Sequence, residues 1–335
     1  MKIKKIIAVF LTALIILMPC ACSKRSDTKI VLITGADGEK GSYTDKSTYE
    51  ALETLSEKYD FELEVIEPSK IQNYEKKIIE IMSDTPKLVI YSNPSSETEA
   101  VISARNYPDT YFVLVGASAD INLDGAQDVN NIYAITFSRT QAGFISGIYA
   151  GRRAQKNICF IGGKEYKSLV EYEASFRAGV MSIASDSSVQ ILYLGDDDSD
   201  EAVTAKLNEQ ITDDCDIIYT VKESKAVYDY AEQKDINVIG AVYDYSSDYP
   251  YKMSFLIKND VQKAISMAID DYFNGTFQGQ IKILGFADEG LTETYADKDD
   301  PAQDIVSVWK ERIIEGAFQI PSNRNEADSF IIPQF

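Results

Sequence analysis

Residues 132–161 read IYAITFSRTQAGFISGIYAGRRAQKNICFI and contain a complete strand–helix–strand unit. The short apolar runs at 132–136 and 158–161 predict buried strands, and the longer segment at 140–153 predicts a helix. A helix of this length is the usual connection between two parallel strands. The unit therefore favours an α/β fold with a parallel sheet.

The same alternation extends along nearly the whole chain. Further strands are predicted at residues 29–33, 61–66, 88–91, 111–115, 189–194, 217–220, 238–241, 253–257 and 281–286. Further helices are predicted at 47–59, 73–82, 97–106, 170–184 and 261–273. The pattern predicts doubly wound parallel sheets covered by helices on both faces, with ligands binding at the carboxyl ends of the strands. Because the chain is long for one core and lacks a linker rich in Pro, Gly or Ser, we expect two lobes joined by several short crossings.

The N-terminus has the features of an export signal. Three lysines lie within the first five residues, an apolar run covers 6–18, and small residues precede Cys22. The run is short for a bilayer-spanning helix. It resembles a bacterial lipoprotein signal, so residues 1–22 are predicted to be a signal peptide with Cys22 lipidated, and 23–28 a short tether. Two alternatives stay open: lipidation at Cys20, and an ordinary secretory signal.

Composition excludes several classes of function. The formal net charge of -20 argues against binding nucleic acid or anionic lipid. The absence of histidine removes the commonest general base and zinc ligand. Apart from Cys20 and Cys22, the cysteines are Cys159 and Cys215, which lie in apolar runs and are expected to be buried; a disulfide between them is an open alternative.

Several motifs together resemble one known family. They are GSYTDKSTYEAL at 41–52, NIYAITF at 131–137 followed by QAGF at 141–144, IGG at 161–163, EYEASFRAGV at 171–180 and KND at 258–260. Their order and spacing are similar to those of the basic membrane lipoproteins, or purine nucleoside receptor family, over roughly residues 29–320. These are the substrate-binding lipoproteins of nucleoside ABC importers.

The resemblance implies a type I periplasmic-binding-protein fold with two lobes hinged around a ligand. The N-terminal lobe is expected to hold residues 29–135 plus about 255–290, and the C-terminal lobe 136–254 plus about 291–335. It implies a small-molecule ligand, an ABC permease as partner and a lipid-anchored place on the extracytoplasmic face of the cell membrane. We further expect a monomer with no enzymatic activity, no cofactor and no metal.

The ligand-binding residues implied by the resemblance lie at the ends of predicted strands or in the first loop. They are Thr44, Asp45, Asn93, Phe137, Asp244 and Lys258. For Asp45 and Asp244 a turn-forming role is the alternative, and for Lys258 a solvated lysine at a strand end.

The chain also departs from the family pattern. Thr44 and Asp45 replace an aromatic residue and an asparagine, and Gly116 stands where an acidic residue is usual. Asp197 stands in place of a second aromatic residue. Val242 stands in place of the first of the two aspartates that the family pattern has. Flat rings stack on a nucleobase and carboxylates accept hydrogen bonds from ribose. We therefore hypothesise that the fold is kept while the ligand has changed.

Four tyrosines near strand ends could supply rings in place of the missing aromatic residues. They are Tyr43, Tyr91, Tyr243 and Tyr245, and for each of them ordinary packing is the simpler interpretation. The glycines at 35, 38 and 41 fit no phosphate-loop spacing and predict an ordinary turn. The acidic runs at 196–200 and 297–300 lack a calcium-hand pattern; the first is expected to cap a helix starting near 201.

Three functions remain for the chain. The first is delivery of a small molecule to an ABC permease; the second is sensing with the same fold but no transporter. The third, an extracytoplasmic hydrolase, is disfavoured because the sequence has neither histidine nor a Gly-x-Ser-x-Gly motif.

Overall fold

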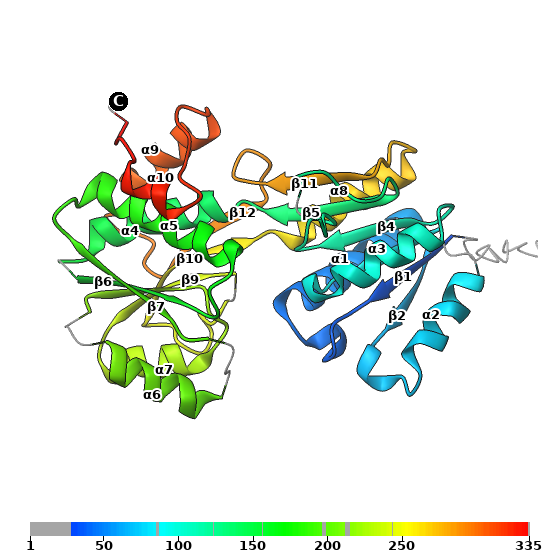
Figure 1. Ribbon diagram of the computed structural model, residues 1–335, viewed down its shortest axis with the longest axis horizontal. Helices are drawn as coiled ribbons and strands as arrows, with labels where there is room; N and C mark the ends of the chain where they lie inside the picture. Colours follow the sequence, from blue (N-terminus) through cyan, green and yellow to red (C-terminus); the bar gives the residue numbers. More distant parts are fainter. Residues whose placement is uncertain are drawn as a thin grey trace, which may run out of the picture.

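The computed structural model describes residues 28–84, 87–122, 124–155, 157–195, 199–211, 215–242 and 244–333. In these segments the chain forms two lobes that lie side by side, each built on one six-stranded sheet (Figure 1). The predicted signal peptide with Cys22, and nearly all of the predicted tether, lie outside the described residues. No helix in the described segments is both long enough and apolar enough to cross a membrane.

The sheet of the first lobe has the strand order β11-β5-β4-β3-β1-β2, and each neighbouring pair is parallel. Its strands are β1 (Lys29–Ile33), β2 (Glu62–Ile66), β3 (Leu88–Tyr91), β4 (Tyr111–Val115), β5 (Ile132–Phe137) and β11 (Gln280–Leu284). The central strands are almost continuous apolar runs because helices cover both of their faces. Every residue of β3 and β5, for example, is buried.

Two pairs of helices cover this first sheet. α1 (Tyr43–Tyr59) and α8 (Val261–Phe273) pack against each other on one face. α2 (Tyr74–Ser83) and α3 (Glu97–Asn106) contribute to the core on the opposite face. Short 3₁₀ turns lie at Gly38–Lys40, Pro68–Lys70 and Pro94–Ser96.

The sheet of the second lobe has the order β12-β10-β9-β8-β6-β7 and is parallel except for its edge strand β12. Its strands are β6 (Asn157–Gly162), β7 (Ser188–Tyr193), β8 (Ile217–Thr220), β9 (Asn237–Ala241), β10 (Met253–Asn259) and β12 (Leu291–Tyr295). The helices α4 (Arg139–Arg153), α5 (Lys167–Ile183), α9 (Gln303–Ile314) and α10 (Arg324–Asp328) lie on one side, and α6 (Asp200–Gln210) and α7 (Lys225–Gln233) on the other (Figure 1).

Glycines let α4 and α5 pack with their backbones in close contact. A Cβ on Gly147 would lie 2.2 Å from the carbonyl oxygen of Phe176, and one on Gly179 would lie 2.1 Å from that of Phe144. No side chain fits at such distances. The glycines that the sequence places on this helix pair therefore fix a tight helix contact beneath the cavity described below.

The described chain crosses between the lobes three times: after Phe137, after Asn259 and in the segment between Leu284 and Leu291. The predicted lobes had their first two boundaries near 135 and 255. Residues 255–259 lie in the second sheet rather than the first, because β10 pairs with both β9 and β12. A single apolar core runs through both lobes on the α1, α8, α4 and α5 side.

Each predicted strand and helix is present, with bounds that differ by at most a few residues. Four elements were not predicted: β12, α7, α9 and α10. β12 is a polar edge strand with the sequence LTETY, and α10 has only five residues. Both are too short or too polar for hydrophobic periodicity to reveal them.

Candidate functional site

A cavity of about 400 Å³ lies between the lobes, at the carboxyl ends of strands from both sheets. Its walls follow β3, β4 and β5 in the first lobe and β8, β9 and β10 in the second. The carboxyl ends of parallel strands are the usual place for a ligand in sheets of this kind. We call this space the interlobe cavity.

The wall from the first lobe is mainly polar. Ser42 and Thr44 come from the start of α1, and Asn93 and Ser95 from the turn after β3. The side-chain oxygen of Asn93 accepts a hydrogen bond from the backbone N–H of Ser95 at 2.9 Å, which holds this turn. Thr44 and Asn93, two of the predicted ligand-binding residues, thus line the cavity.

Asp45 lies behind this wall rather than on it. Its side chain is 1% exposed. One carboxylate oxygen accepts hydrogen bonds from the backbone N–H of Gly35 at 3.0 Å and from the hydroxyl of Ser92. The other accepts from the hydroxyl of Ser42 at 2.8 Å. Asp45 therefore joins the loops after β1 and β3 and positions the polar wall.

The backbone at Gly116 excludes the acidic residue that the family pattern would place there. Gly116 follows β4 and has a φ of +88°. This backbone conformation is strained for any residue that carries a side chain. A Cβ at this position would also lie 2.6 Å from Cγ of Pro94. Restoring a carboxylate here would require both the backbone and Pro94 to move.

The wall facing the polar one is largely apolar. It is formed by Phe137, Leu169, Tyr172, Val221 and Val242. Phe137, the third predicted residue in the cavity, ends β5 at the first crossing between the lobes. Burial raises the pKa of Tyr172 to about 12, so its hydroxyl stays protonated at neutral pH. This wall can hold an apolar or flat part of a ligand.

Val242 is strained as well as apolar. Its φ is 68°, a left-handed conformation that is unusual for a β-branched residue. Its backbone N–H donates to the carbonyl of Ile257 at 3.2 Å. It occupies the position of the first aspartate in the family pattern.

Charged groups of both signs lie on the second-lobe side. The guanidinium of Arg139 lies 3.3 Å from the carboxylate of Glu171, and Glu223 follows β8 on the cavity wall. Among the described residues that line the cavity, Glu223 is the one with a carboxylate. The mixture leaves no large excess of either charge around a ligand.

Asp244 and Lys258 interact with each other instead of lining the described cavity wall. Their charged groups are 3.7 Å apart, and both side chains are about one-third exposed. Asp244 also accepts hydrogen bonds from the backbone N–H of Ser246 at 3.0 Å and from its hydroxyl at 2.6 Å. This is the turn-forming arrangement that was the alternative for Asp244.

The tyrosines considered as replacement rings have other surroundings. Tyr91 is fully buried and its hydroxyl lies 3.1 Å from that of Ser103. Tyr245 packs on Tyr228, with ring centroids 4.9 Å apart. Tyr43 donates a hydrogen bond to the carbonyl of Asn259 at 2.9 Å and so joins α1 to the end of β10. Tyr243 lies outside the described residues.

A second hollow of about 630 Å³ adjoins the interlobe cavity. The two share Pro94, Gly116, Phe137 and Arg139. These shared residues lie between the two hollows.

The acidic runs do not form a cation site in the described part of the chain. There, no three His, Cys, Asp or Glu side chains lie close enough to hold a metal ion. Asp297 accepts from the backbone N–H of Asp299, and Asp300 from that of Ala302, as in ordinary turns. Residues 196–198 of the other run lie outside the described residues.

Comparison with known proteins identifies the family. Residues 28–324 match the family described as "ABC transporter substrate-binding protein PnrA-like". The chain belongs to this family. Among curated relatives, an ABC transporter nucleoside-binding protein, BmpA, from Lactococcus lactis is 22% identical over 89% of this chain and 90% of its own length. A CD4+ T-cell-stimulating antigen from Listeria innocua is 21% identical over 65% of each chain.

Solved structures show the same fold. An ABC transporter solute-binding protein from Conexibacter woesei superposes with a TM-score of 0.70 at 17% identity and covers 88% of this chain and 99% of its own. One from Aeropyrum pernix gives 0.69 at 16% identity, covering 90% and 95%. The predicted fold class and family are confirmed: the chain is a two-lobed α/β substrate-binding protein of the ABC transporter type.

Several cavity residues were missed by the sequence prediction. Arg139, Leu169 and Tyr172 line the cavity, yet none of them was singled out as a site residue. Tyr172 lies within the EYEASFRAGV motif, on the first turns of α5. A signal was therefore present, but the motif alone does not tell which of its side chains faces the ligand.

Proposed function

We propose that this protein is the lipid-anchored substrate-binding component of an ABC importer and works on the extracytoplasmic face of the membrane. The observation that carries the proposal is a cavity at the carboxyl ends of both sheets, in a chain that matches the family over residues 28–324. The lobes, joined by three crossings, close on a small molecule, and the closed monomer docks on the permease.

The anchor is proposed at Cys22. In cells grown with a labelled fatty acid, the native chain should carry the label and remain with the membrane fraction. The Cys22→Ala variant should lose both properties, whereas the matched Cys20→Ala variant should keep them. If the Cys22→Ala variant is still labelled, the lipid is attached at Cys20 instead. If the native chain carries no label, the N-terminus is an ordinary secretory signal.

The ligand we propose is a small polar molecule other than a common ribonucleoside. It would place its hydrogen-bonding groups on Ser42, Thr44 and Asn93 and its apolar or flat part on Phe137 and Tyr172. The support is the loss of carboxylate acceptors at the positions where the family pattern has them: Gly116 and Val242 carry none, and Asp45 is engaged in three internal hydrogen bonds, which leaves Glu223 as the carboxylate among the described cavity residues. Each unpaired ribose hydroxyl would cost about 1–3 kcal/mol.

A thermal-shift screen tests this ligand class. The probes are adenosine, guanosine, inosine, cytidine and uridine, the free bases, simple sugars and amino acids. A ligand at 100 times its dissociation constant stabilises the protein by about 2.7 kcal/mol, which moves the melting temperature by several degrees. Calorimetry then measures the affinity. Micromolar binding of several nucleosides would overturn the proposal that the ligand has changed. It would still agree with a substrate-binding function.

Transport is tested separately with the ligand that the screen identifies. Uptake of that labelled ligand by the native organism should fall when the gene is deleted and return with the full chain. At a ligand concentration near the native dissociation constant, uptake should return only in part with the Phe137→Leu variant, whose affinity is expected to be about tenfold weaker. Unchanged uptake in the deletion strain would overturn the transport role, and sensing by the same fold would then be the remaining function.

A further inference from the structure

The second-lobe wall of the interlobe cavity carries one charge of each sign. In the described part of that wall, Arg139 is the one cationic side chain and Glu223 is the one carboxylate. Arg139 is the first residue of α4, and Glu223 follows β8. The other described side chains that line the cavity are uncharged. A ligand that complements the cavity therefore carries both a negative and a positive group.

The guanidinium of Arg139 keeps most of its hydrogen-bonding capacity. Its Nη1 lies 3.3 Å from a carboxylate oxygen of Glu171, and the described residues give it no second hydrogen-bond acceptor. A guanidinium has five N–H donors in a planar fork that matches the two oxygens of a carboxylate. The side chain of Arg139 is 30% exposed. A carboxylate of the ligand can therefore approach it from the cavity.

Glu223 presents the opposite charge to the cavity. It is exposed at the end of β8. A carboxylate accepts about four hydrogen bonds, and an ammonium group donates three. Val221 and Val242 line the cavity on the same lobe and have no polar side-chain atom. Glu223 is therefore the group on this wall to which an ammonium group of the ligand can bind.

Closure of the lobes makes this charge pattern selective. Before closure, water solvates Arg139 and Glu223, and closure around a ligand removes part of that water. A charge that loses water without gaining a partner of opposite sign is destabilised. An uncharged sugar gives neither group such a partner, and a singly charged ligand gives one to only one of them. A zwitterion gives a partner to both.

The size and the apolar surface of the cavity restrict the zwitterion further. The volume of about 400 Å³ is near the small end of the range of about 300–1,000 Å³ that ligand pockets have. Phe137, Leu169 and Tyr172 offer apolar contacts within the same cavity. These features suit an amino acid with an apolar or aromatic side chain.

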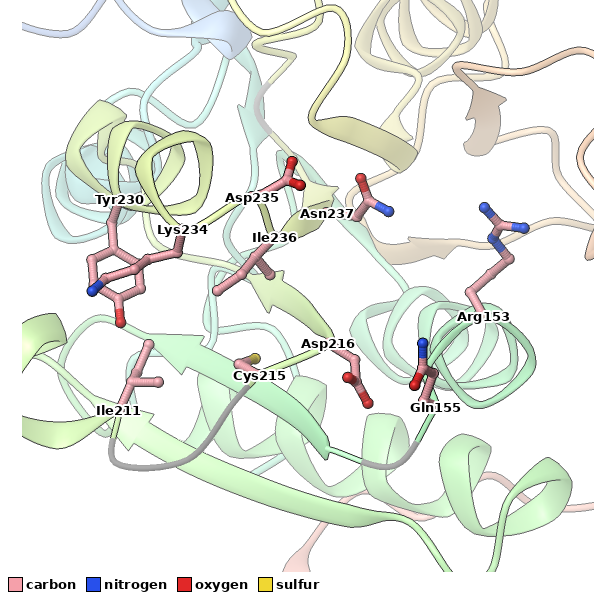
Figure 2. A pocket seen from close by; sticks show the side chains of 10 residues that line it. All are labelled: Arg153, Gln155, Ile211, Cys215, Asp216, Tyr230, Lys234, Asp235, Ile236 and Asn237. Carbon is pink, nitrogen blue, oxygen red and sulfur yellow. The ribbon is translucent and has the colours of Figure 1, made fainter.

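A hollow at the other end of α4 also has charged walls, but it lies outside the region that closes. α4 runs from Arg139 at the interlobe cavity to Arg153, which lies on the wall of this hollow of about 560 Å³ (Figure 2). Arg153 lies 3.7 Å from Asp300, and Asp235 pairs with Lys252. The described residues that line the hollow all belong to the second lobe, so closure of the lobes does not enclose a ligand there.

We propose that the ligand of the interlobe cavity is an amino acid with an apolar or aromatic side chain, bound through its carboxylate by Arg139 and through its ammonium group by Glu223. This inference rests on the binding function proposed above and names the ligand class for the same cavity. Thr44 and Asn93 would add hydrogen bonds from the first lobe.

Calorimetry on the full chain tests the inference with matched ligands. L-leucine and L-phenylalanine are compared with the amines that lack the carboxylate, 3-methylbutylamine and 2-phenylethylamine. They are also compared with the acids that lack the amino group, 4-methylpentanoate and 3-phenylpropionate. We expect micromolar binding of at least one of the two amino acids. Its amine and its acid should each bind roughly ten- to a hundredfold more weakly, because each loses charged hydrogen bonds.

Variants assign each charge of the ligand to its residue. In Arg139→Gln the amino acid should bind only about as tightly as its amine, and in Glu223→Gln only about as tightly as its acid. Glu171→Gln should bind the amino acid up to roughly fivefold more tightly, because Arg139 is then released from its pair. If Arg139 only held the fold through Glu171, both variants of this pair would instead lose affinity. Arg312→Gln, which changes an exposed residue of α9 outside the cavity, is the control and should bind as the native chain does.

The outcomes separate this inference from the proposed function. Binding of neither amino acid, or equal affinity for an amino acid and both of its analogues, would overturn the inference. The analogue series uses the native chain, so it decides the matter even if a variant does not fold. If a sugar or a nucleoside binds instead, the ligand class is wrong and the binding function stands. If no probe of any class binds, the proposed binding function fails as well.

Discussion

The short helix α10 is fastened to α5 through one buried carboxylate. Glu173 on α5 is 2% exposed, and Arg324 on α10 donates to it through Nε at 3.0 Å and Nη2 at 2.6 Å. Tyr193 on β7 donates to the same carboxylate at 2.8 Å. Arg324 Nη1 reaches Glu165 at 2.7 Å, so this one arginine joins three segments of the second lobe.

We predict that Arg324→Ala lowers the free energy of unfolding by about 2–4 kcal/mol. Removing one partner of a fully buried ion pair costs about 3–5 kcal/mol, because the remaining charge loses its compensation. Arg324 is 42% exposed and Glu173 keeps the hydroxyl of Tyr193, so water and this hydrogen bond reduce the cost. Arg324→Lys should recover part of the stability, since lysine keeps the charge but loses the two-pronged geometry.

The chain provides its own probe for the measurement. Its single tryptophan, Trp309, is 5% exposed on α9 in the same lobe and packs against Phe144, with ring centroids 5.4 Å apart. Urea unfolding followed by tryptophan fluorescence therefore reports on the lobe that α10 stabilises. The matched control is Arg312→Ala, which removes an exposed pair with Glu315 and should cost less than about 1 kcal/mol.

A double-mutant cycle with Glu173→Gln separates the pair from the rest of the lobe. If the argument is right, Arg324→Ala costs much less in the Glu173→Gln background, because no buried charge is then left unpaired. The reasoning fails if Arg324→Ala costs no more than Arg312→Ala, or if the coupling energy in the cycle is close to zero.

Three further predictions concern the first lobe and the cavity. Phe137→Leu should weaken the ligand found in the screen about tenfold in calorimetry, because the ring contact is lost while the core stays filled; unchanged affinity would place the ligand elsewhere. Asp45→Asn should destabilise the protein by about 1–3 kcal/mol in urea and also weaken the ligand, because the amide keeps one acceptor oxygen and the hydroxyl of Ser42 then loses the other; equal stability would contradict its positioning role. Burial alone would raise the pKa of Glu64, but Lys29 at 2.7 Å and Lys77 at 3.3 Å outweigh it and the pKa is lowered. Its stabilising effect, about 0.5–1 kcal/mol, is therefore present at neutral pH and lost as the pH falls through the lowered pKa. Urea unfolding at neutral pH and near pH 3.5 should show a smaller acid loss in Glu64→Gln than in the native chain, and equal losses would contradict this.

Much of the fold follows from the sequence because buried parallel strands carry a strong local signal. Runs such as 88–91 and 111–115 are apolar at every position or nearly so, and helix-forming segments separate them. The polar edge strand β12 gave no such signal. The second crossing was placed a few residues early, because the sequence of β10 does not show which sheet will pair with it; its partners β9 and β12 decide that.

The candidate site was harder to predict because a cavity depends on which loops meet in space. Thr44, Asn93 and Phe137 were expected at the site from the family resemblance, and all three line the cavity. Arg139 and Tyr172 were missed because their exposure to the cavity depends on how α4 and α5 pack. Tight packing at Gly147 and Gly179 sets that arrangement, and it cannot be read from local periodicity.

The two unlike walls of the cavity suggest how ligand binding drives closure. A ligand favours the closed form only to the extent that it binds that form more tightly than the open one. The first lobe offers hydrogen-bonding groups such as Thr44 and Asn93, which a ligand can meet before the lobes close. Tyr172 and Val221 belong to the second lobe and add their contacts only on closure. An aromatic contact of about 1–3 kcal/mol changes the ratio of closed to open forms by roughly 5- to 150-fold. Under the closure mechanism proposed above, changes at Tyr172 and Val221 should therefore reduce closure more than first encounter, and changes in the polar wall should reduce both.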